Sequence, residues 1–276
     1  MKFLRFILSH SIFIACSAVA LSLQTLLLLH LPVNFYLLLF IFFASLCGYN
    51  SYWLLGKFSL HTGMSFFDFL KKQYSYLSMI VVGCLGMLFS LLFLKLFLYN
   101  IIITFFLLGL YSIPLLPFKQ LYFTRKAGFA KTIVLSITWA HVTTMIPLQK
   151  SFLHLQVNEL LIYMIHFLFV LMLCIIFDKR DAAMDSRRGM HSMATDLNEK
   201  MLHSTMLIIF VLFSLICIAL QKYNIELRQS VGLLATAVIT LIVYHYSRKE
   251  QNYFFYYFLV DGLMLFSGLL TYLLSI

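Results

Sequence analysis

The sequence has very little charge for its length. Only 11% of its 276 residues are Asp, Glu, Lys or Arg, and ten of these are acidic, whereas 62% of the chain is hydrophobic. A soluble domain of this size needs a charged surface, so the composition excludes a soluble globular protein. Proline and glycine are also scarce, at 4 and 11 residues, and no linker is rich in Pro or Ser. We therefore expect a single domain that covers residues 1–276.

Cysteine motifs and nucleotide or hydrolase motifs are missing as well. The five cysteines lie within or at the ends of apolar runs, and none has CxxC spacing. They are best interpreted as small packing residues rather than as disulfides or metal ligands. The sequence contains no Gly-rich phosphate loop, no HExxH and no GxSxG, so no motif of these kinds indicates a function.

What the sequence does contain is a series of long apolar runs. A bilayer core about 30 Å thick needs about 20 apolar residues per spanning helix. Nine runs satisfy this, with approximate limits 6–29, 33–55, 73–94, 97–117, 129–148, 158–177, 202–221, 229–246 and 253–275. Lys2 and Arg5 precede the first run as in a signal peptide, but the run continues well past the small residues at 15–17, so we expect a retained span. The sequence predicts an all-α polytopic membrane protein with nine transmembrane helices.

The net charge of +10 is explained by membrane topology. With the N-terminus in the cytoplasm, sixteen of the 20 Lys and Arg residues fall on the cytoplasmic side and four on the other. This is the positive-inside bias of an inserted helical bundle, so the charge does not indicate nucleic-acid binding. We expect an integral protein of a membrane such as the bacterial inner membrane, with a cytoplasmic N-terminus and the lipid bilayer as its surroundings.

Three acidic residues cluster after the sixth run, in the segment FDKRDAAMDSRRGMHSMAT (177–195). On a helix, Asp178, Asp181 and Asp185 fall within about a 60° arc, and this face points to the cytoplasm in the predicted topology. Carboxylates in this pattern suit a hard cation, and Mg²⁺ in particular binds one or two carboxylates together with phosphate oxygens. The alternative, on spacing alone, is a solvated helix end whose carboxylates pair with Arg188.

This segment resembles the second Asp-rich motif of the UbiA superfamily of intramembrane prenyltransferases. The motif, D-x-x-D-x-x-x-D, a basic residue and G-x-x-S/T-h-A, stands here as Asp178, Asp181, Asp185, Arg187, Gly189, Ser192, Met193 and Ala194. The family places it on the cytoplasmic side between the sixth and seventh of nine helices, where the predicted spans also put it. YSIPLLPFKQ (111–120) and KTIVLSITWAHVTTMIPL (131–148) are similar to the family's fourth and fifth spans. The resemblance covers essentially the whole chain and implies a UbiA-like bundle.

The resemblance implies an enzyme that transfers an alkyl group other than methyl. In the family, two Asp-rich motifs face each other across a cavity and hold Mg²⁺ on the diphosphate of a polyprenyl donor. The allylic C–O bond ionises, and the prenyl group alkylates a hydrophobic acceptor such as an aromatic quinone precursor. By this resemblance Asp181 and Asp185 are the expected catalytic metal ligands, with Asp178 as a third ligand to the metal. The residues expected to contact the diphosphate are Asn50, Lys119, Arg125, Lys126 and Arg188, although the positive-inside rule also accounts for the basic ones.

The family's first Asp-rich motif, roughly N-D-x-x-D-x-x-x-D after the second span, is degenerate here. The chain reads YNSYWLLGKF at 49–58, where Asn50 matches the motif's Asn. The three Asp positions hold Ser51, Leu54 and Phe58. The neighbouring Lys57 and His61 either bind phosphate directly as cations or only reflect topology. Two functions therefore stay open: a Mg²⁺-dependent prenyltransferase, or a non-catalytic UbiA-fold protein that binds lipid or a partner.

Three of the ionisable residues inside the apolar runs need an explanation. Asp261 in the last run is costly to bury, so it is either functional or hydrogen-bonded to a neighbouring helix. His141 and His166 are expected to form hydrogen bonds between helices rather than to bind a metal. Asp261 stands nearly alone among the runs, so a transporter ranks below the other two functions.

Overall fold

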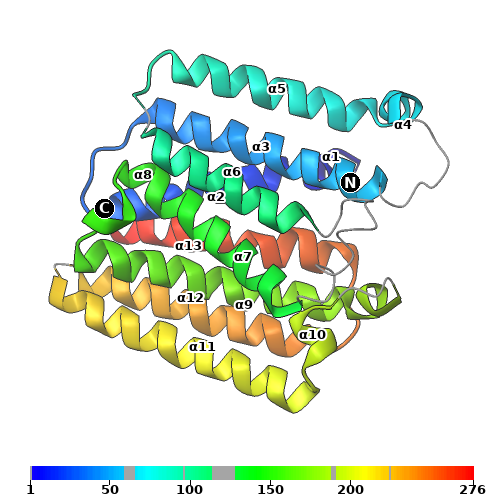
Figure 1. Cartoon of the computed structure of the whole chain (residues 1–276). Helices are drawn as coiled ribbons and strands as arrows, with labels where there is room; N and C mark the ends of the chain where they lie inside the picture. The colour runs from blue at the N-terminus through cyan, green and yellow to red at the C-terminus, as the bar shows by residue number, and fades with distance from the viewer. Residues whose placement is uncertain (1, 59–65, 96, 114–127, 188–190, 224) are drawn as a thin grey trace.

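The helices of the chain lie side by side and share one long direction (Figure 1). The computed structural model describes residues 2–58, 66–95, 97–113, 128–187, 191–223 and 225–276, and this part of the chain contains no β-strand. The first half comprises α1 (Lys2–Ser9), α2 (Ile12–Leu28), α3 (Phe35–Phe58), α4 (Phe66–Lys72), α5 (Tyr74–Leu91) and α6 (Leu98–Ser112). The second half comprises α7 (Gly128–Ala140), α8 (Ile146–Leu148), α9 (Val157–Arg187), α10 (Met193–Asp196), α11 (Glu199–Leu220), α12 (Leu227–Tyr246) and α13 (Asp261–Leu274).

Short segments of other helix types join these elements. Two are π-helices, His141–Met145 between α7 and α8, and Phe255–Val260 directly before α13. Two 3₁₀ turns, Phe152–His154 and Gln221–Tyr223, lie at the end of the bundle away from the N-terminus.

Each apolar run predicted from the sequence contains a helix. Among the described residues, seven helical segments are long and apolar enough to cross a membrane: Phe35–Phe58, Tyr74–Leu91, Phe129–Leu148, Val157–Arg187, Glu199–Tyr223, Leu227–Tyr246 and Phe255–Leu274. The bent pair Phe3–Ser9 and Ile12–Leu28 makes an eighth if it forms one span, and Leu98–Ser112 is a shorter apolar helix. An all-helical membrane-type protein is thus confirmed, while the count of nine crossings stays a prediction.

The first predicted run is not one continuous helix. The chain bends by 65° between α1 and α2, at Ser11, whose φ of 60° places it in the left-handed region. This conformation is strained for a serine, and a hydropathy pattern does not predict it. Leu8, Ser11 and Ile14, around this bend, help to line the cavity described below.

α9 forms the centre of the bundle, and α5 lies at its edge (Figure 1). The apolar part of α9 from Ile162 to Ile176 is almost entirely buried against α7, α11 and α12. α5 buries only Gly83 and Ser90, and a Cβ on Gly83 would lie 2.8 Å from the Cβ of Cys47 on α3. Membrane helices associate through such small-residue contacts because lipid supplies no hydrophobic force between them. All five cysteines are free thiols, as expected of packing residues.

The buried histidines bond neighbouring helices, which confirms the sequence prediction. His166 Nδ1 lies 2.8 Å from Thr143 Oγ1 and 3.1 Å from Thr144 Oγ1, and its Nε2 lies 3.2 Å from Gln24 Oε1. His141 Nε2 lies 3.2 Å from a backbone carbonyl of α6. These contacts fix α2, the first π-helix and α9 to one another.

Candidate functional site

A cavity of about 510 Å³ lies toward the end of the bundle where α9 finishes and the N-terminus lies. Its walls come from α1 and α2, α3, α6, α7, α9, the second π-helix and α13. Its charged lining residues are Lys57, Lys131, Asp178, Arg180, Asp181, Asp185 and Asp261. Aromatic rings, mainly of tyrosine, and a few aliphatic side chains make up most of the remaining wall. All three carboxylates of the predicted motif therefore share one cavity.

The length of α9 places this acidic face at the end of the bundle. Its 31 residues run from the apolar Val157–Ile176 part into the charged end DKRDAAMDSR without a break. At 1.5 Å per residue the helix is about 46 Å long, longer than the ~30 Å core of a bilayer. The helix is described to Arg187, and Ser192 of the motif is the N-cap of α10.

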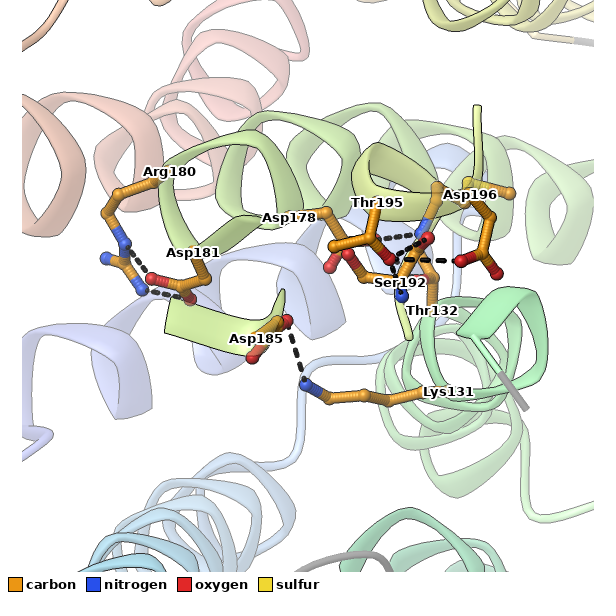
Figure 2. Close-up of polar contacts among 10 residues, drawn as sticks. Lys131, Thr132, Asp178, Arg180, Asp181, Asp185, Ser192, Thr195 and Asp196 are labelled. Atoms are coloured by element: carbon orange, nitrogen blue, oxygen red, sulfur yellow. Dashed lines mark hydrogen bonds and ion pairs between the residues drawn. The ribbon is translucent and has the colours of Figure 1, made fainter. Parts of the chain in front are cut away.

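Asp178 is held by donors from two other elements (Figure 2). Its Oδ2 accepts a hydrogen bond of 2.6 Å from Thr132 Oγ1 on α7 and one of 3.2 Å from the Met193 N–H at the start of α10. These bonds satisfy a carboxylate that would otherwise be costly at this depth. Asp178 therefore ties α9 to the elements on either side of the cavity.

Asp181 forms a bidentate ion pair with its neighbour Arg180. Arg180 Nε and Nη2 donate to the two carboxylate oxygens, each over 2.8 Å (Figure 2). The guanidinium carbon also lies 4.8 Å, 5.3 Å and 4.9 Å from the ring centroids of Phe177, Tyr256 and Tyr257. Arginine suits this place because its planar group can stack on rings while it binds a carboxylate. A cation of the protein thus already engages Asp181.

Asp185 faces Lys131 on α7 across the cavity (Figure 2). The Nζ–Oδ2 distance is 4.0 Å, and the side chains of Asp185 and Lys131 are 6% and 20% exposed. This separation is at the outer limit of an ion pair, so the attraction is Coulombic without a hydrogen bond. Arg188, the partner expected on spacing alone, lies outside the described residues.

The donor set fits a hard cation only if a substrate completes it. Within the described ranges no three His, Cys, Asp or Glu residues lie together closely enough to hold a metal ion. The carboxylates of Asp178, Asp181 and Asp185 nevertheless line one cavity, and Mg²⁺ commonly takes one or two carboxylates plus phosphate oxygens. The residues present therefore suit Mg²⁺ brought to the cavity with a phosphorylated ligand.

The residues of α3 that line the cavity are shifted by one position relative to the family's first Asp-rich motif. Tyr49, Trp53 and Lys57, four residues apart, line the cavity. Asn50 instead is buried in the bundle, where its amide donates to the His10 carbonyl over 2.9 Å and to the Leu46 carbonyl over 2.8 Å. Asn50 is not among the cavity-lining residues, because one helical residue rotates a side chain by about 100°, and its contact with a diphosphate stays a prediction.

Several predicted contacts fall on residues that the structure does not describe. These are Lys119, Arg125, Lys126 and Arg188, together with His61. Their contacts to a diphosphate stay predictions.

Sequence reasoning missed three contacts of the site. Lys131 was attributed only to the positive-inside bias, Arg180 was expected at phosphate oxygens rather than at Asp181, and Thr132 carried no signal because a threonine in an apolar run is ordinary. Asp261 was noticed as an intramembrane carboxylate, and it is 9% exposed and lines the same cavity as the Asp-rich face. An acidic pattern finds ligands on one helix, whereas the partners on other helices become apparent only in three dimensions.

Aromatic hydroxyls shape the opposite part of the cavity. Trp139 Nε1 donates to the Tyr49 hydroxyl over 2.6 Å, which leaves the proton of that hydroxyl directed elsewhere. Tyr253 stacks on Tyr257 with ring centroids 4.3 Å apart, and burial raises the pKa of the Tyr253 phenol above its usual value. The rings of Tyr49, Tyr253 and Tyr257 form part of the cavity wall.

Comparison with known proteins identifies the fold. No family model matches the chain, and no curated protein sequence matches it significantly. The apo structure of a UbiA homolog from Aeropyrum pernix K1 superposes with a TM-score of 0.61 at 14% identity, covering 97% of each chain. A structure of digeranylgeranylglyceryl phosphate synthase superposes with a TM-score of 0.60 at 12% identity, covering 100% of this chain and 98% of that one. The chain therefore has the fold of these two structures.

Proposed function

We propose that this protein is a UbiA-like membrane prenyltransferase, which moves a prenyl group from a polyprenyl diphosphate to a hydrophobic acceptor. One observation carries the proposal: Asp178, Asp181 and Asp185 share a cavity with aromatic walls, within a fold that the digeranylgeranylglyceryl phosphate synthase also has. A polar, acidic end suits a diphosphate, and an apolar wall suits a prenyl chain. The acceptor is proposed as an apolar molecule, such as an aromatic quinone precursor.

Each group of the cavity has a role in this reaction. Asp178, Asp181 and Asp185 would hold Mg²⁺, which when bound neutralises the charge that develops on the leaving diphosphate. Lys131, facing Asp185, orients the diphosphate and adds positive charge next to it. The rings of Tyr49, Trp53 and their neighbours exclude water from the allylic cation and stabilise it through their π faces.

The bonds and charges of the transfer balance without an oxidant or reductant. The allylic C–O bond breaks and its electron pair leaves with the diphosphate. A nucleophilic atom of the acceptor then forms the new bond to the prenyl carbon and loses a proton. The Arg180–Asp181 pair must loosen for Asp181 to reach a metal, which makes Arg180 a regulator of the metal affinity.

We also propose the finer topology expected from the charge distribution. The chain would cross the bacterial inner membrane nine times as one domain, with the N-terminus and the Asp-rich end of α9 in the cytoplasm. The described chain supports this proposal because its two termini lie at opposite ends of the bundle, which requires an odd number of crossings (Figure 1).

Ligand binding by detergent-purified protein tests the proposed function. We expect farnesyl or geranylgeranyl diphosphate to bind when Mg²⁺ is present, and Asp181→Asn to lose the metal-dependent part of that binding. Glu250→Gln, an exposed acidic position beyond α12, is the matched control. Binding that is indifferent to both metal and Asp181 would instead favour a non-catalytic protein that retains the fold.

A further inference from the structure

The cavity wall that faces the acidic end of α9 carries a cation where a second acidic motif was expected. We propose that Lys57 and Lys131 bind the substrate diphosphate directly and take the place of a second metal ion, so that binding requires one Mg²⁺. This inference rests on the proposed function, since it concerns how the same diphosphate is held.

The first argument is the composition of the α3 wall. The α3 residues that line the cavity are Tyr49, Tyr52, Trp53, Gly56 and Lys57. Within α3, which is described from Phe35 to Phe58, this face has no carboxylate, and Lys57 is its charged member. A second Mg²⁺ would find no acidic ligand on this wall, because Mg²⁺ in proteins depends on carboxylate oxygens.

The second argument is the position of Lys57. Its Nζ lies 3.4 Å from Gln73 Oε1 and 4.0 Å from the centroid of the Tyr76 ring. Both contacts come from the start of α5 and its preceding residue, which are not among the cavity-lining residues, whereas Lys57 itself is. An ammonium group carries three donors, so a phosphate oxygen can be one of the acceptors of Lys57.

The third argument concerns Lys131 and the balance of charge. Asp178, Asp181, Asp185 and Asp261 contribute four carboxylates to the described lining, against the three cations Lys57, Lys131 and Arg180. Arg180 is committed to Asp181 in a bidentate pair, whereas Lys131 lies 4.0 Å from Asp185, too far for a hydrogen bond. Lys131 is therefore better placed than Arg180 to donate to a phosphate oxygen, and Lys57 lines the same cavity. The two ammonium groups would add positive charge beside the diphosphate, next to a single Mg²⁺ at the acidic face.

A metal count and a binding measurement test the inference without relying on turnover. Farnesyl S-thiolodiphosphate, an unreactive donor analogue, is titrated into purified protein, with Mn²⁺ as a paramagnetic substitute counted by electron paramagnetic resonance. We expect one bound Mn²⁺ per chain. Lys57→Met and Lys131→Met should each weaken analogue binding about tenfold or more, because each removes a charge-assisted hydrogen bond. Lys57→Arg should retain most of the affinity, and Lys72→Met, an exposed lysine of α4 outside the cavity, should leave it unchanged.

A double variant that places carboxylates on α3 provides a second test. Trp53→Asp combined with Lys57→Asp places two carboxylates one helical turn apart on the cavity face of α3. We expect this double variant to bind a second Mn²⁺ in the presence of the analogue. Elution of each variant as the same monodisperse species in size-exclusion chromatography establishes that it folds.

The outcomes separate this inference from the proposed function. If the unaltered protein binds the analogue with metal but Lys57→Met and Lys131→Met bind it equally well, the inference is wrong and the proposed function stands. Two Mn²⁺ ions bound by the unaltered protein would also overturn the inference. If the unaltered protein binds no analogue with any metal, the proposed function fails, and the inference fails with it.

Discussion

At the scale of single residues, the acidic face of α9 is already balanced by the protein itself. Asp178 has Thr132 and a backbone N–H, Asp181 has Arg180, and Asp185 faces Lys131. Such partners let three carboxylates lie on one helical face without strong mutual repulsion. Any cation that binds here must compete with the protein's own donors, and this competition leads to the first prediction.

Arg180→Met should raise the affinity of the site for Mg²⁺ or Mn²⁺. The substitution keeps much of the apolar contact with the rings of Phe177 and Tyr256 but removes the competitor for the Asp181 carboxylate. We expect metal binding, measured by Mn²⁺ titration, to tighten several-fold, while the thermal midpoint falls because the ion pair is lost. Arg248→Met, which removes an exposed arginine 3.8 Å from Glu199, should not change the metal affinity. Weaker metal binding in Arg180→Met would show that Arg180 supports the site rather than competing with the metal.

Thr132→Val should impair the site through Asp178. The variant has nearly the same shape but leaves the Asp178 carboxylate without its 2.6 Å hydrogen bond. A hydrogen bond to a charged group contributes about 1.5–3 kcal/mol, and only the bond from the Met193 N–H remains, so we expect a lower free energy of unfolding and weaker metal-dependent diphosphate binding. Thr132→Ser retains the hydroxyl and should restore both quantities. Equal behaviour of the Val and Ser variants would contradict a role for this bond.

At the scale of helices, close approach of backbones decides the packing. Gly268 on α13 lies directly against α2, and a Cβ added there would overlap the backbone carbonyl of Ala20. Because the clash involves backbone rather than a flexible side chain, the two helices must move apart to accommodate it. α2 and α13 both contribute to the cavity, so their separation also affects the site.

Gly268→Ala should therefore destabilise the protein. Overpacking typically costs about 1–3 kcal/mol, which we expect to lower the thermal midpoint of the detergent-solubilised protein by several degrees. Gly109→Ala on α6 is the matched control, since nothing lies within 4 Å of the position that its Cβ would occupy. A midpoint for Gly268→Ala that equals that of Gly109→Ala would contradict the close contact between α2 and α13.

The hydrogen-bond network around His166 belongs to the same scale. His166→Leu would leave the Thr143 hydroxyl and the Gln24 carbonyl oxygen without their histidine partner in the interior. We expect the free energy of unfolding to fall by about 1–3 kcal/mol, because buried polar groups lose a hydrogen-bond partner. His166 is not among the cavity-lining residues, so diphosphate affinity should not change. A selective loss of binding with unchanged stability would place His166 in the function instead.

At the scale of the whole molecule, hydropathy and charge predicted the helical membrane class, because a span must be long and apolar. The Asp178, Asp181 and Asp185 face was predicted because the three residues share one helix, whose periodicity is readable. Asn50 bonds within the bundle rather than lining the cavity, because one position along a helix turns a side chain by about 100°. The contacts of Lys131 and Thr132 with the acidic face were missed because they are set by packing between helices, which no local pattern encodes.

The termini provide the last prediction at this scale. They lie at opposite ends of the bundle, so the chain should cross the membrane an odd number of times (Figure 1). The positive-inside bias assigns the N-terminus to the cytoplasm. In a bacterial host, a C-terminal alkaline phosphatase fusion should be active in the periplasm, and a C-terminal green fluorescent protein fusion should stay dark. The same reporters fused after Lys249, between α12 and the second π-helix, should show the reverse pattern.

A fluorescent C-terminal fusion would mean that the chain makes an even number of crossings or that its orientation is inverted, and the fusion after Lys249 distinguishes these cases. Fluorescence at both positions would mean that the last helix does not cross, whereas fluorescence only at the C-terminus would mean that the whole bundle is inverted and that the acidic end of α9 faces the periplasm.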